Sequence, residues 1–391
     1  MSSAKLTNAP RGLVTWYKKS PKMVQTQAEN FLPWYFRNHF RKLSLPYEQK
    51  IRGPRDGVAF NPRFITIKPT FRCNLRCSFC RYVANGQVFG KADYFLDDEW
   101  FDLIDEVAPA KPYISITGGE PLLYPRIGEL LQHCKDRGLH VHMVTNGTLL
   151  ERKAEELMKA PPASLQISVD GRGEKHDALR MVSGTFEKVV KGLKKLNEVK
   201  AEMNTHQPLV AINSVISGEN YRNMPEMVEV AQELGADLLN FQHFWFTTES
   251  MLDDHNNQWG DCFYMDKEET GFTETTGIDT AELWKIMTDI EETSPMMTTF
   301  YPKLDQTELD TYYNRPTEAI RPRIPGCAWL QTAIFPNGDV SPCFNHVVGN
   351  IREQSFEEIW NGEKFRAHRM RLSEHGGYSM CARCCAYFRY D

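Results

Sequence analysis

Three cysteines lie close together in the stretch FRCNLRCSFC, residues 71–80. Cys73, Cys77 and Cys80 have the spacing CxxxCxxC, and no fourth cysteine stands near them. A structural zinc site normally has four ligands, often in two closely spaced pairs. Three thiolates on one loop can instead hold three corners of a [4Fe–4S] cluster, whereas an electron-transfer cluster usually has a fourth cysteine. The spacing favours a cluster with one open iron, and zinc is the alternative.

A second group of cysteines lies near the end of the chain: Cys327, Cys343, Cys381, Cys384 and Cys385. The two groups hold eight of the ten cysteines, and we expect the isolated Cys134 and Cys262 to be ordinary buried thiols. The N-terminal sequence MSSAKLTNAPRGLVTW has no signal-peptide pattern, which predicts a cytoplasmic location. In a reducing compartment, clustered cysteines indicate metal binding rather than disulfides.

Composition excludes some classes of protein. A net charge of −5 argues against a general nucleic-acid binder, which would normally be basic. Because no run of about 18 apolar residues occurs, we expect no membrane-spanning helix. The segment FLPWYFRNHFRKL (31–43) mixes aromatic and basic residues. It could be an interfacial membrane helix, but we favour a helix packed on the rest of the protein with its basic side in solvent.

Residues 62–245 alternate between short β-branched runs and stretches with helical spacing. The expected strands are FITIK (64–68), YISIT (113–117), HVHMVT (140–145), SLQISV (164–169), LVAINSVI (209–216) and LLNFQHF (238–244). The expected helices include Trp100 to Val107, Ile127 to Cys134, Phe186 to Val199 and Met224 to Leu234. This alternation predicts an α/β fold of parallel βα units, as a partial barrel or an open doubly wound sheet. Either arrangement places the chemistry at the carboxyl ends of the strands.

The remaining segments give weaker signals. We divide the chain into an N-terminal helical segment (1–60), a core (61–245), an insertion or linker (246–326) and a cysteine-rich segment (327–391). From Glu249 to Thr270 the sequence is acidic and aromatic without a strand signal, which indicates either a solvated loop or a substrate lid. The last segment is predicted to form hairpins and one short helix, Ser355–Arg369. It is too small to fold without a stabilising cross-link such as a metal site.

Several stretches together resemble the radical S-adenosylmethionine (SAM) superfamily. They are CNLRCSFC (73–80), TGGEP (117–121), VTNGT (144–148), SLQISVDG (164–171) and HDALRMVSGTF (176–186). The resemblance implies a partial (β/α)6 TIM-like barrel. It also implies that the three cysteines hold a SAM-binding [4Fe–4S] cluster, whose open iron is where SAM binds.

The resemblance also implies roles for residues of this chain. In the GGEP motif, Gly118, Gly119, Glu120 and Pro121, the backbone would receive the SAM amino group. Ser168 and Arg180 would contact the SAM carboxylate, and Asp170 would lie near the ribose. Asn146, Asn213, and Gln242 or His243 would also face this pocket. Gly118 and Gly119 have a physical reason to be glycines, because a residue without Cβ lets backbone approach a ligand closely.

The C-terminal cysteines resemble the SPASM and twitch extensions of radical SAM enzymes. Gly338 stands five positions before Cys343, and CARCC follows at 381–385. A full SPASM domain uses about seven cysteines, whereas this segment has five, so the resemblance implies one auxiliary [4Fe–4S] cluster. Its ligands would be Cys327, Cys343, Cys381 and Cys384, with Cys385 as a spare or substitute. A zinc ribbon that uses the same four residues is the alternative.

The implied function is that of a radical SAM oxidoreductase or maturase. Reductive cleavage of SAM would give a 5′-deoxyadenosyl radical that abstracts a substrate hydrogen atom, and the auxiliary cluster would move electrons. His243 is the candidate general base. The expected partners are a small-molecule substrate such as an amino sugar, or a peptide, and a one-electron reductant such as flavodoxin or ferredoxin. The alternative is a non-catalytic iron–sulfur electron carrier or sensor, which would not need GGEP, Ser168, Asp170 and Arg180.

Overall fold

A single ten-stranded sheet forms the centre of the molecule in the computed structural model. The structure describes residues 56–84, 97–266, 276–322, 324–343 and 346–388. Nearly all of the helical segment expected at 1–60, including 31–43, lies outside these residues. The strand order is β10-β9-β8-β1-β2-β3-β4-β5-β6-β7. Among the described helices, none is long and apolar enough to cross a membrane.

Six consecutive parallel strands form the core of this sheet. They are β1 (Phe64–Ile67), β2 (Tyr113–Ile116), β3 (Val141–Thr145), β4 (Ser164–Ser168), β5 (Leu209–Ile216) and β6 (Leu238–His243). All six were expected, and each of their ends lies within one residue of its expected position. The α/β fold class of a partial barrel is therefore confirmed.

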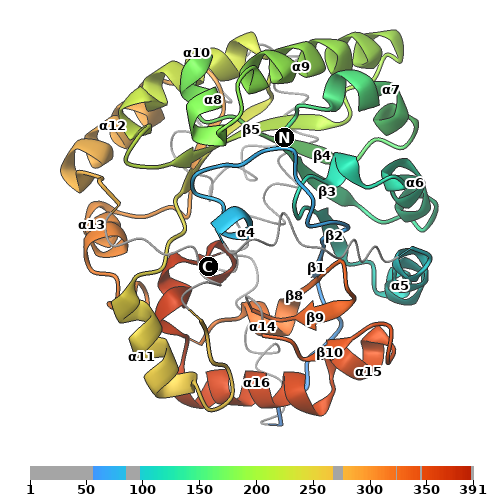
Figure 1. Ribbon diagram of the computed structural model, residues 1–391, viewed down its shortest axis with the longest axis vertical. Coiled ribbons are helices and arrows are strands. Elements are labelled where there is room, and N and C mark those ends of the chain that lie inside the picture. Colours follow the sequence, from blue (N-terminus) through green and yellow to red (C-terminus); the bar gives the residue numbers. More distant parts are fainter. Residues whose placement is uncertain (1–55, 85–96, 267–275, 323, 344–345, 389–391) are drawn as a thin grey trace, which may run out of the picture.

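Helices surround the outer side of the curved sheet (Figure 1). They include α5 (Glu99–Val107), α6 (Ile127–Asp136), α7 (Leu150–Lys159), α9 (Thr185–Glu202) and α10 (Met224–Glu233). α7 was not among the expected helices, nor was the short α8 (Glu174–Arg180). α5 and α7 bury one apolar stripe each, as amphipathic helices on a sheet do.

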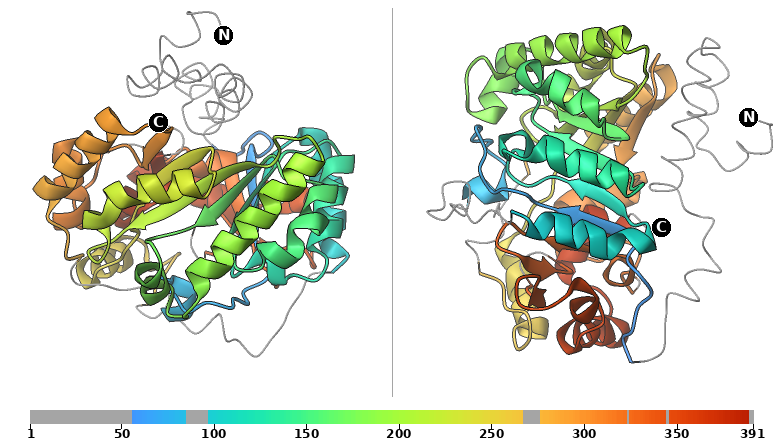
Figure 2. Two further views of the ribbon diagram at one scale, coloured as in Figure 1. Left: turned by 90° about the horizontal axis from the view of Figure 1, so that it is seen from above. Right: turned by 90° about the vertical axis from the view of Figure 1, so that its right-hand side faces the viewer.

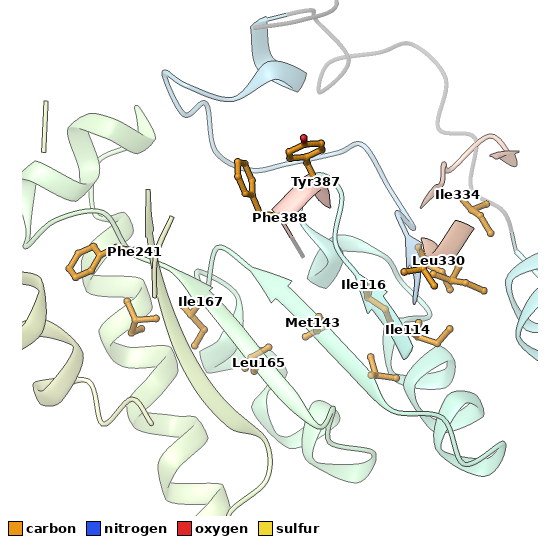
Figure 3. Close-up of a cluster of buried hydrophobic side chains, with 14 of the residues drawn as sticks. Ile114, Ile116, Met143, Leu165, Ile167, Phe241, Leu330, Ile334, Tyr387 and Phe388 are labelled. Atoms are coloured by element: carbon orange, nitrogen blue, oxygen red, sulfur yellow. The ribbon is translucent and has the colours of Figure 1, made fainter. Parts of the chain in front are cut away.

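The two faces of the parallel strands differ in chemistry because side chains alternate along a strand. The outer face is apolar and fully buried, as Ile114, Ile116, Met143, Leu165, Ile167 and Phe241 illustrate (Figure 3). A Cβ at Gly147 would touch both Ile167 and Val189 of α9, which places Ile167 on the helix side. The opposite, inner face carries Ser168, Asn213 and Asn240, so the inside of the barrel is polar.

The sheet extends past the six core strands in both directions. β7 (Thr298–Tyr301) pairs in parallel with β6, and β8 (Gln331–Ile334) pairs in parallel with β1. β9 (Asp339–Ser341) and β10 (Gly349–Asn350) continue antiparallel from β8. The cysteine-rich segment therefore shares the sheet of the barrel.

The segment 246–326 contains regular structure that the sequence reading missed. Its helices are α11 (Glu249–Trp259), α12 (Thr280–Thr293) and α13 (Gln306–Asn314). A solvated loop is wrong for residues 249–259, because α11 buries Met251, Leu252, His255 and Trp259. Thr248 caps this helix by accepting a hydrogen bond from the Met251 N–H. The lid role stays a prediction.

The single helix expected at Ser355–Arg369 is two helices, α15 (Phe356–Trp360) and α16 (Glu363–His375). They separate at Asn361, whose side chain accepts from the Ala59 N–H (2.9 Å) and donates to the Ala59 carbonyl (3.0 Å). Figures 1 and 2 show α16 beside α11, where Arg371 pairs with Asp261. The C-terminal segment is thus attached to the barrel from two sides.

Arg369 of α16 is a buried anchor between these parts. Its guanidinium donates to the carbonyl oxygens of Gly57 (3.1 Å) and Ala328 (2.9 Å) and to Asn361 Oδ1 (3.0 Å). Burial lowers its pKa to about 9. We predict that Arg369→Ala lowers the free energy of unfolding by about 3 kcal/mol, because it leaves several buried acceptors without a donor.

The measurement is the urea midpoint of the reconstituted protein, with Arg366→Ala in the same helix as the control. Arg366 pairs with Asp56 at the surface (3.4 Å), so its loss should cost under about 1 kcal/mol. Equal midpoints for the two variants would contradict the anchoring role of Arg369.

Candidate functional site

The cysteine loop follows β1 and lies directly against the GGEP segment. The Gly119 N–H donates to the Thr70 carbonyl (2.9 Å), and the Glu120 N–H donates to the Arg72 carbonyl (2.7 Å). A Cβ at Gly119 would overlap the carbonyl oxygens of Phe71 and Arg72. Gly118 has φ +131°, and a Cβ there would lie 2.7 Å from the Thr70 oxygen. The glycines therefore let two stretches of protein backbone meet, and their approach to a ligand stays a prediction.

Cys73, Cys77 and Cys80 lie near one another on this loop. Burial raises the pKa of Cys73 to about 11, and Glu120, Cys77 and Cys80 raise it further. Burial also raises the pKa of Cys77, while Arg180 acts in the opposite direction. Burial therefore favours the uncharged form of Cys73 and Cys77, and metal binding would deprotonate them. Three adjacent soft donors fit the open [4Fe–4S] cluster.

Within the described residues, no three His, Cys, Asp or Glu side chains converge on one ion. The thiolates of a cubane cluster bind different irons and need no such convergence.

Glu120 joins the GGEP segment to the turn after β3. Its carboxylate accepts hydrogen bonds from Thr145 Oγ1 (2.7 Å) and from the N–H groups of Asn146 (2.8 Å) and Leu122 (3.0 Å). It is 1% exposed, and burial raises its pKa. Pro121 opens the short turn Pro121–Leu123 that follows. Because its carboxylate is occupied, the Glu120 side chain joins GGEP to the turn after β3. Only the backbone of Glu120 would then contact the expected ligand.

Asn146 connects the same turn to the cysteine loop. Its Nδ2 donates to Asn74 Oδ1 (2.9 Å) and lies 3.8 Å from Cys73 Sγ. Asn74 in turn donates to Thr148 Oγ1 (2.8 Å). Three chain segments that follow β1, β2 and β3 are thereby fixed against one another.

Asp170 and Arg180 form a buried ion pair beside Cys77. Arg180 Nη1 lies 3.5 Å from Cys77 Sγ, and Asp170 Oδ1 accepts from the Val215 N–H (2.8 Å). Burial raises the pKa of Asp170, while Arg180 acts against this. Arg180 Nε is buried and has no hydrogen-bond partner. Since buried polar atoms are normally paired, an unpaired nitrogen at this position is unusual.

Ser168 and Asn213 lie side by side on the inner face, because they are directly paired between β4 and β5. His243 does not join them. It points to the outer face of β6, as Leu239 and Phe241 do. Its Nδ1 lies 2.8 Å from the Tyr313 hydroxyl of α13. Burial lowers its pKa to about 3. Among the two sixth-strand candidates, Gln242 is on the inner face, so the placement of His243 does not support a role as general base.

The C-terminal cysteines also gather in one place. A hydrogen bond between the Cys384 and Cys385 thiols and burial raise the pKa of Cys384, and Cys343 and Cys327 add to this effect. Burial likewise raises the pKa of Tyr378, to which the nearby Cys343, Cys381 and Cys327 contribute. All four expected ligands and Cys385 thus belong to one cluster of thiols. This donor set fits one auxiliary [4Fe–4S] cluster, with either Cys384 or Cys385 as the fourth ligand.

Arg383, between the cysteines of CARC, is a site residue that the sequence reading missed. It is 1% exposed, and its guanidinium donates to four backbone carbonyls at the end of α13 and beyond: Tyr312 (3.1 Å), Thr311 (2.6 Å), Arg315 (2.7 Å) and Glu318 (3.0 Å). Its position between two expected ligands was the available signal. Arg383 fixes the loop that presents them.

The two isolated cysteines differ. Cys134 is fully buried in α6, as expected. Cys262 is exposed, which contradicts the expectation of a buried thiol. It follows α11 in a turn at the surface, where its Sγ donates to the Trp259 carbonyl (3.4 Å).

Comparisons with known proteins agree with this geometry. The profile of the radical SAM superfamily matches residues 67–239, and that of the SPASM iron–sulfur cluster-binding domain matches residues 327–385. The AdoMet-dependent heme synthase of Methanosarcina barkeri is 30% identical over 322 residues, which cover 78% of this chain and 84% of the relative. The tungsten-containing aldehyde ferredoxin oxidoreductase cofactor-modifying protein of Pyrococcus furiosus is 25% identical over 82% of this chain and 87% of its own.

A solved structure shares the fold. SuiB of Streptococcus suis has a TM-score of 0.58 at 17% identity, over 82% of this chain and 70% of its own. The family matches, the cysteine loop against GGEP and the C-terminal thiol cluster lead to one conclusion: this chain belongs to the radical SAM superfamily, carries a SPASM iron–sulfur domain, and has SAM and [4Fe–4S] clusters as its cofactors.

Proposed function

We propose that this protein is a radical SAM oxidoreductase or maturase that abstracts a hydrogen atom from its substrate. The observation that carries the proposal is the convergence of Cys73, Cys77 and Cys80 with GGEP and Arg180 at the carboxyl ends of the strands. With its cofactors bound, such a site supplies a 5′-deoxyadenosyl radical by one-electron cleavage of SAM. The protein's own task is to bind, orient and exclude water.

Individual residues have separate tasks in this proposal. Arg180 would hold the SAM carboxylate through its unpaired Nε, with Ser168 beside it, while Asp170 keeps the guanidinium in place. The GGEP backbone would receive the amino group. Cys327, Cys343, Cys381 and Cys384 would hold one auxiliary cluster that moves electrons during net oxidation. A protein that only carried electrons would not need the Asp170–Arg180 pair, which argues against the carrier alternative.

The substrate is proposed as a polar small molecule or a peptide. The inner face of β4 to β7 offers uncharged hydrogen-bonding groups, namely Ser168, Asn213, Asn240, Gln242 and Thr299. The names of similar proteins include both kinds of substrate, since one is a heme synthase and SuiB has been crystallised with a precursor peptide. Flavodoxin or ferredoxin is the proposed source of the electron.

The first prediction separates the two cysteine groups. Anaerobically reconstituted protein should contain about eight irons per chain, because each [4Fe–4S] cluster holds four. Cys77→Ala should abolish formation of 5′-deoxyadenosine from SAM and dithionite. Cys343→Ala should retain this cleavage with about four irons per chain. Iron analysis and chromatography of 5′-deoxyadenosine are the measurements.

Several results would contradict parts of the proposal. Wild-type protein that binds SAM but never cleaves it would rule out the enzyme. Zinc in place of iron, retained in Cys77→Ala and lost in Cys343→Ala, would assign the C-terminal site to a zinc ribbon.

A further prediction concerns Arg383. Arg383→Gln removes a guanidinium that four backbone carbonyls share, so the Cys381–Cys384 loop should lose its position. We expect about four irons per chain, with SAM cleavage retained.

The control is Arg352→Gln, because Arg352 makes a half-exposed pair with Glu99 (3.0 Å) away from the thiols. It should keep about eight irons. A full iron content in Arg383→Gln would show that the loop does not depend on Arg383.

A further inference from the structure

Four polar side chains form a continuous row across four strands on the inner face of the barrel. Ser168 of β4 pairs with Asn213 of β5, Asn213 with Asn240 of β6, and Asn240 with Thr299 of β7. Directly paired residues of parallel strands point to the same face. The stacked rings of Phe241 and Phe300, 5.4 Å apart, mark the opposite face. The row therefore runs from β7 to the SAM site.

Hydrogen bonds give this row a direction. Thr299 Oγ1 donates to Asn240 Oδ1 (2.9 Å), and Asn240 Nδ2 donates to Asn213 Oδ1 (2.6 Å). A side-chain amide that accepts at its oxygen and donates at its nitrogen is held in one of its two orientations. Because the Asn213 oxygen is occupied by Asn240, the Asn213 Nδ2 group is the one left for the next position, beside Ser168.

We propose that Asn240 and Thr299 are positioning residues that make Asn213 a hydrogen-bond donor to an acceptor oxygen of bound SAM. The inference rests on the proposed function, since that function places SAM beside Ser168. Thr299 lies on β7, beyond the residues 67–239 that match the superfamily profile, and Asn240 directly follows them. The segment 246–326 thereby contributes to the SAM site through the orientation of one amide.

The position of the row makes a purely structural role testable. Asn213 is 5% exposed, so water has little access to replace the hydrogen bonds that orient its amide. If the row only stabilised the sheet, its disruption would lower the unfolding midpoint and leave SAM affinity unchanged. If it orients Asn213, its disruption raises the Kd for SAM and this effect needs Asn213.

The experiment measures SAM binding by equilibrium dialysis to reconstituted, oxidised protein, in which no turnover occurs. Thr299→Val removes the hydroxyl and should raise the Kd about fivefold to tenfold, the loss of one oriented hydrogen bond. Thr299→Ser keeps the hydroxyl and should restore a Kd within about twofold of wild type. Thr298→Val is the matched control, because Thr298 is the preceding residue of β7 and points to the other face. It too should stay within about twofold.

Two further variants test the role of Asn213. In an Asn213→Ala background, Thr299→Val should cause no additional rise in Kd, because the amide it orients is gone. Asn213→Asp can still accept from Asn240 but has no donor, so its Kd should rise at least as much as that of Asn213→Ala. An unchanged Kd in Asn213→Asp would overturn the donor assignment.

The outcomes separate this inference from the proposed function. Wild-type protein that neither binds nor cleaves SAM would contradict the proposed function. Wild-type protein that does both, with equal Kd values for Thr299→Val and Thr298→Val, would overturn the positioning role alone. An equal effect of Thr299→Val with and without Asn213 would overturn it as well.

Discussion

The close approach of two backbone segments, the cysteine loop and GGEP, is the constraint on which the rest of the site depends. At Gly119 the two backbone segments are so close that no Cβ fits between them, and two backbone hydrogen bonds join them. Glu120 connects these segments to the end of β3 and the turn after it, because its buried carboxylate accepts hydrogen bonds from Thr145 and Asn146. The backbone that carries the three thiols is therefore fixed relative to the expected SAM contacts of the GGEP segment.

The parallel register of the sheet supplies the second half of the geometry. It brings Ser168 and Asn213, which are far apart in sequence, to adjacent positions on the inner face. The same register places His243 on the outer face, because consecutive residues of a strand point to opposite faces. A residue therefore reaches a site at the carboxyl ends of parallel strands only if it lies near the end of its strand and also points to the inner face.

Much of this could be read from the sequence, and the failures have physical reasons. The six core strands were found because each is a short segment with alternating or continuous apolar residues, followed by a stretch with helical spacing. β7 and β8 were missed because the strands that they pair with lie about 60 and 270 residues away in the chain, so the local sequence does not reveal the pairing. The placement of His243 on the outer face could have been expected, because the order Leu239, Phe241, His243 already indicates the buried face. Arg383 was overlooked because its partners are backbone carbonyls, which no side-chain pattern reveals.

The pairing of β8 with β1 explains how one chain can keep two cysteine groups in a fixed relation. β1 leads into the loop of Cys73, and β8 lies between Cys327 and Cys343. Four residue pairs, between Phe64–Ile67 and Gln331–Ile334, join the two regions in a parallel ladder. A shared sheet holds two regions at a constant separation better than a flexible linker would. The C-terminal domain is therefore a continuation of the barrel, and its cluster site is positioned by the same strand that positions the first.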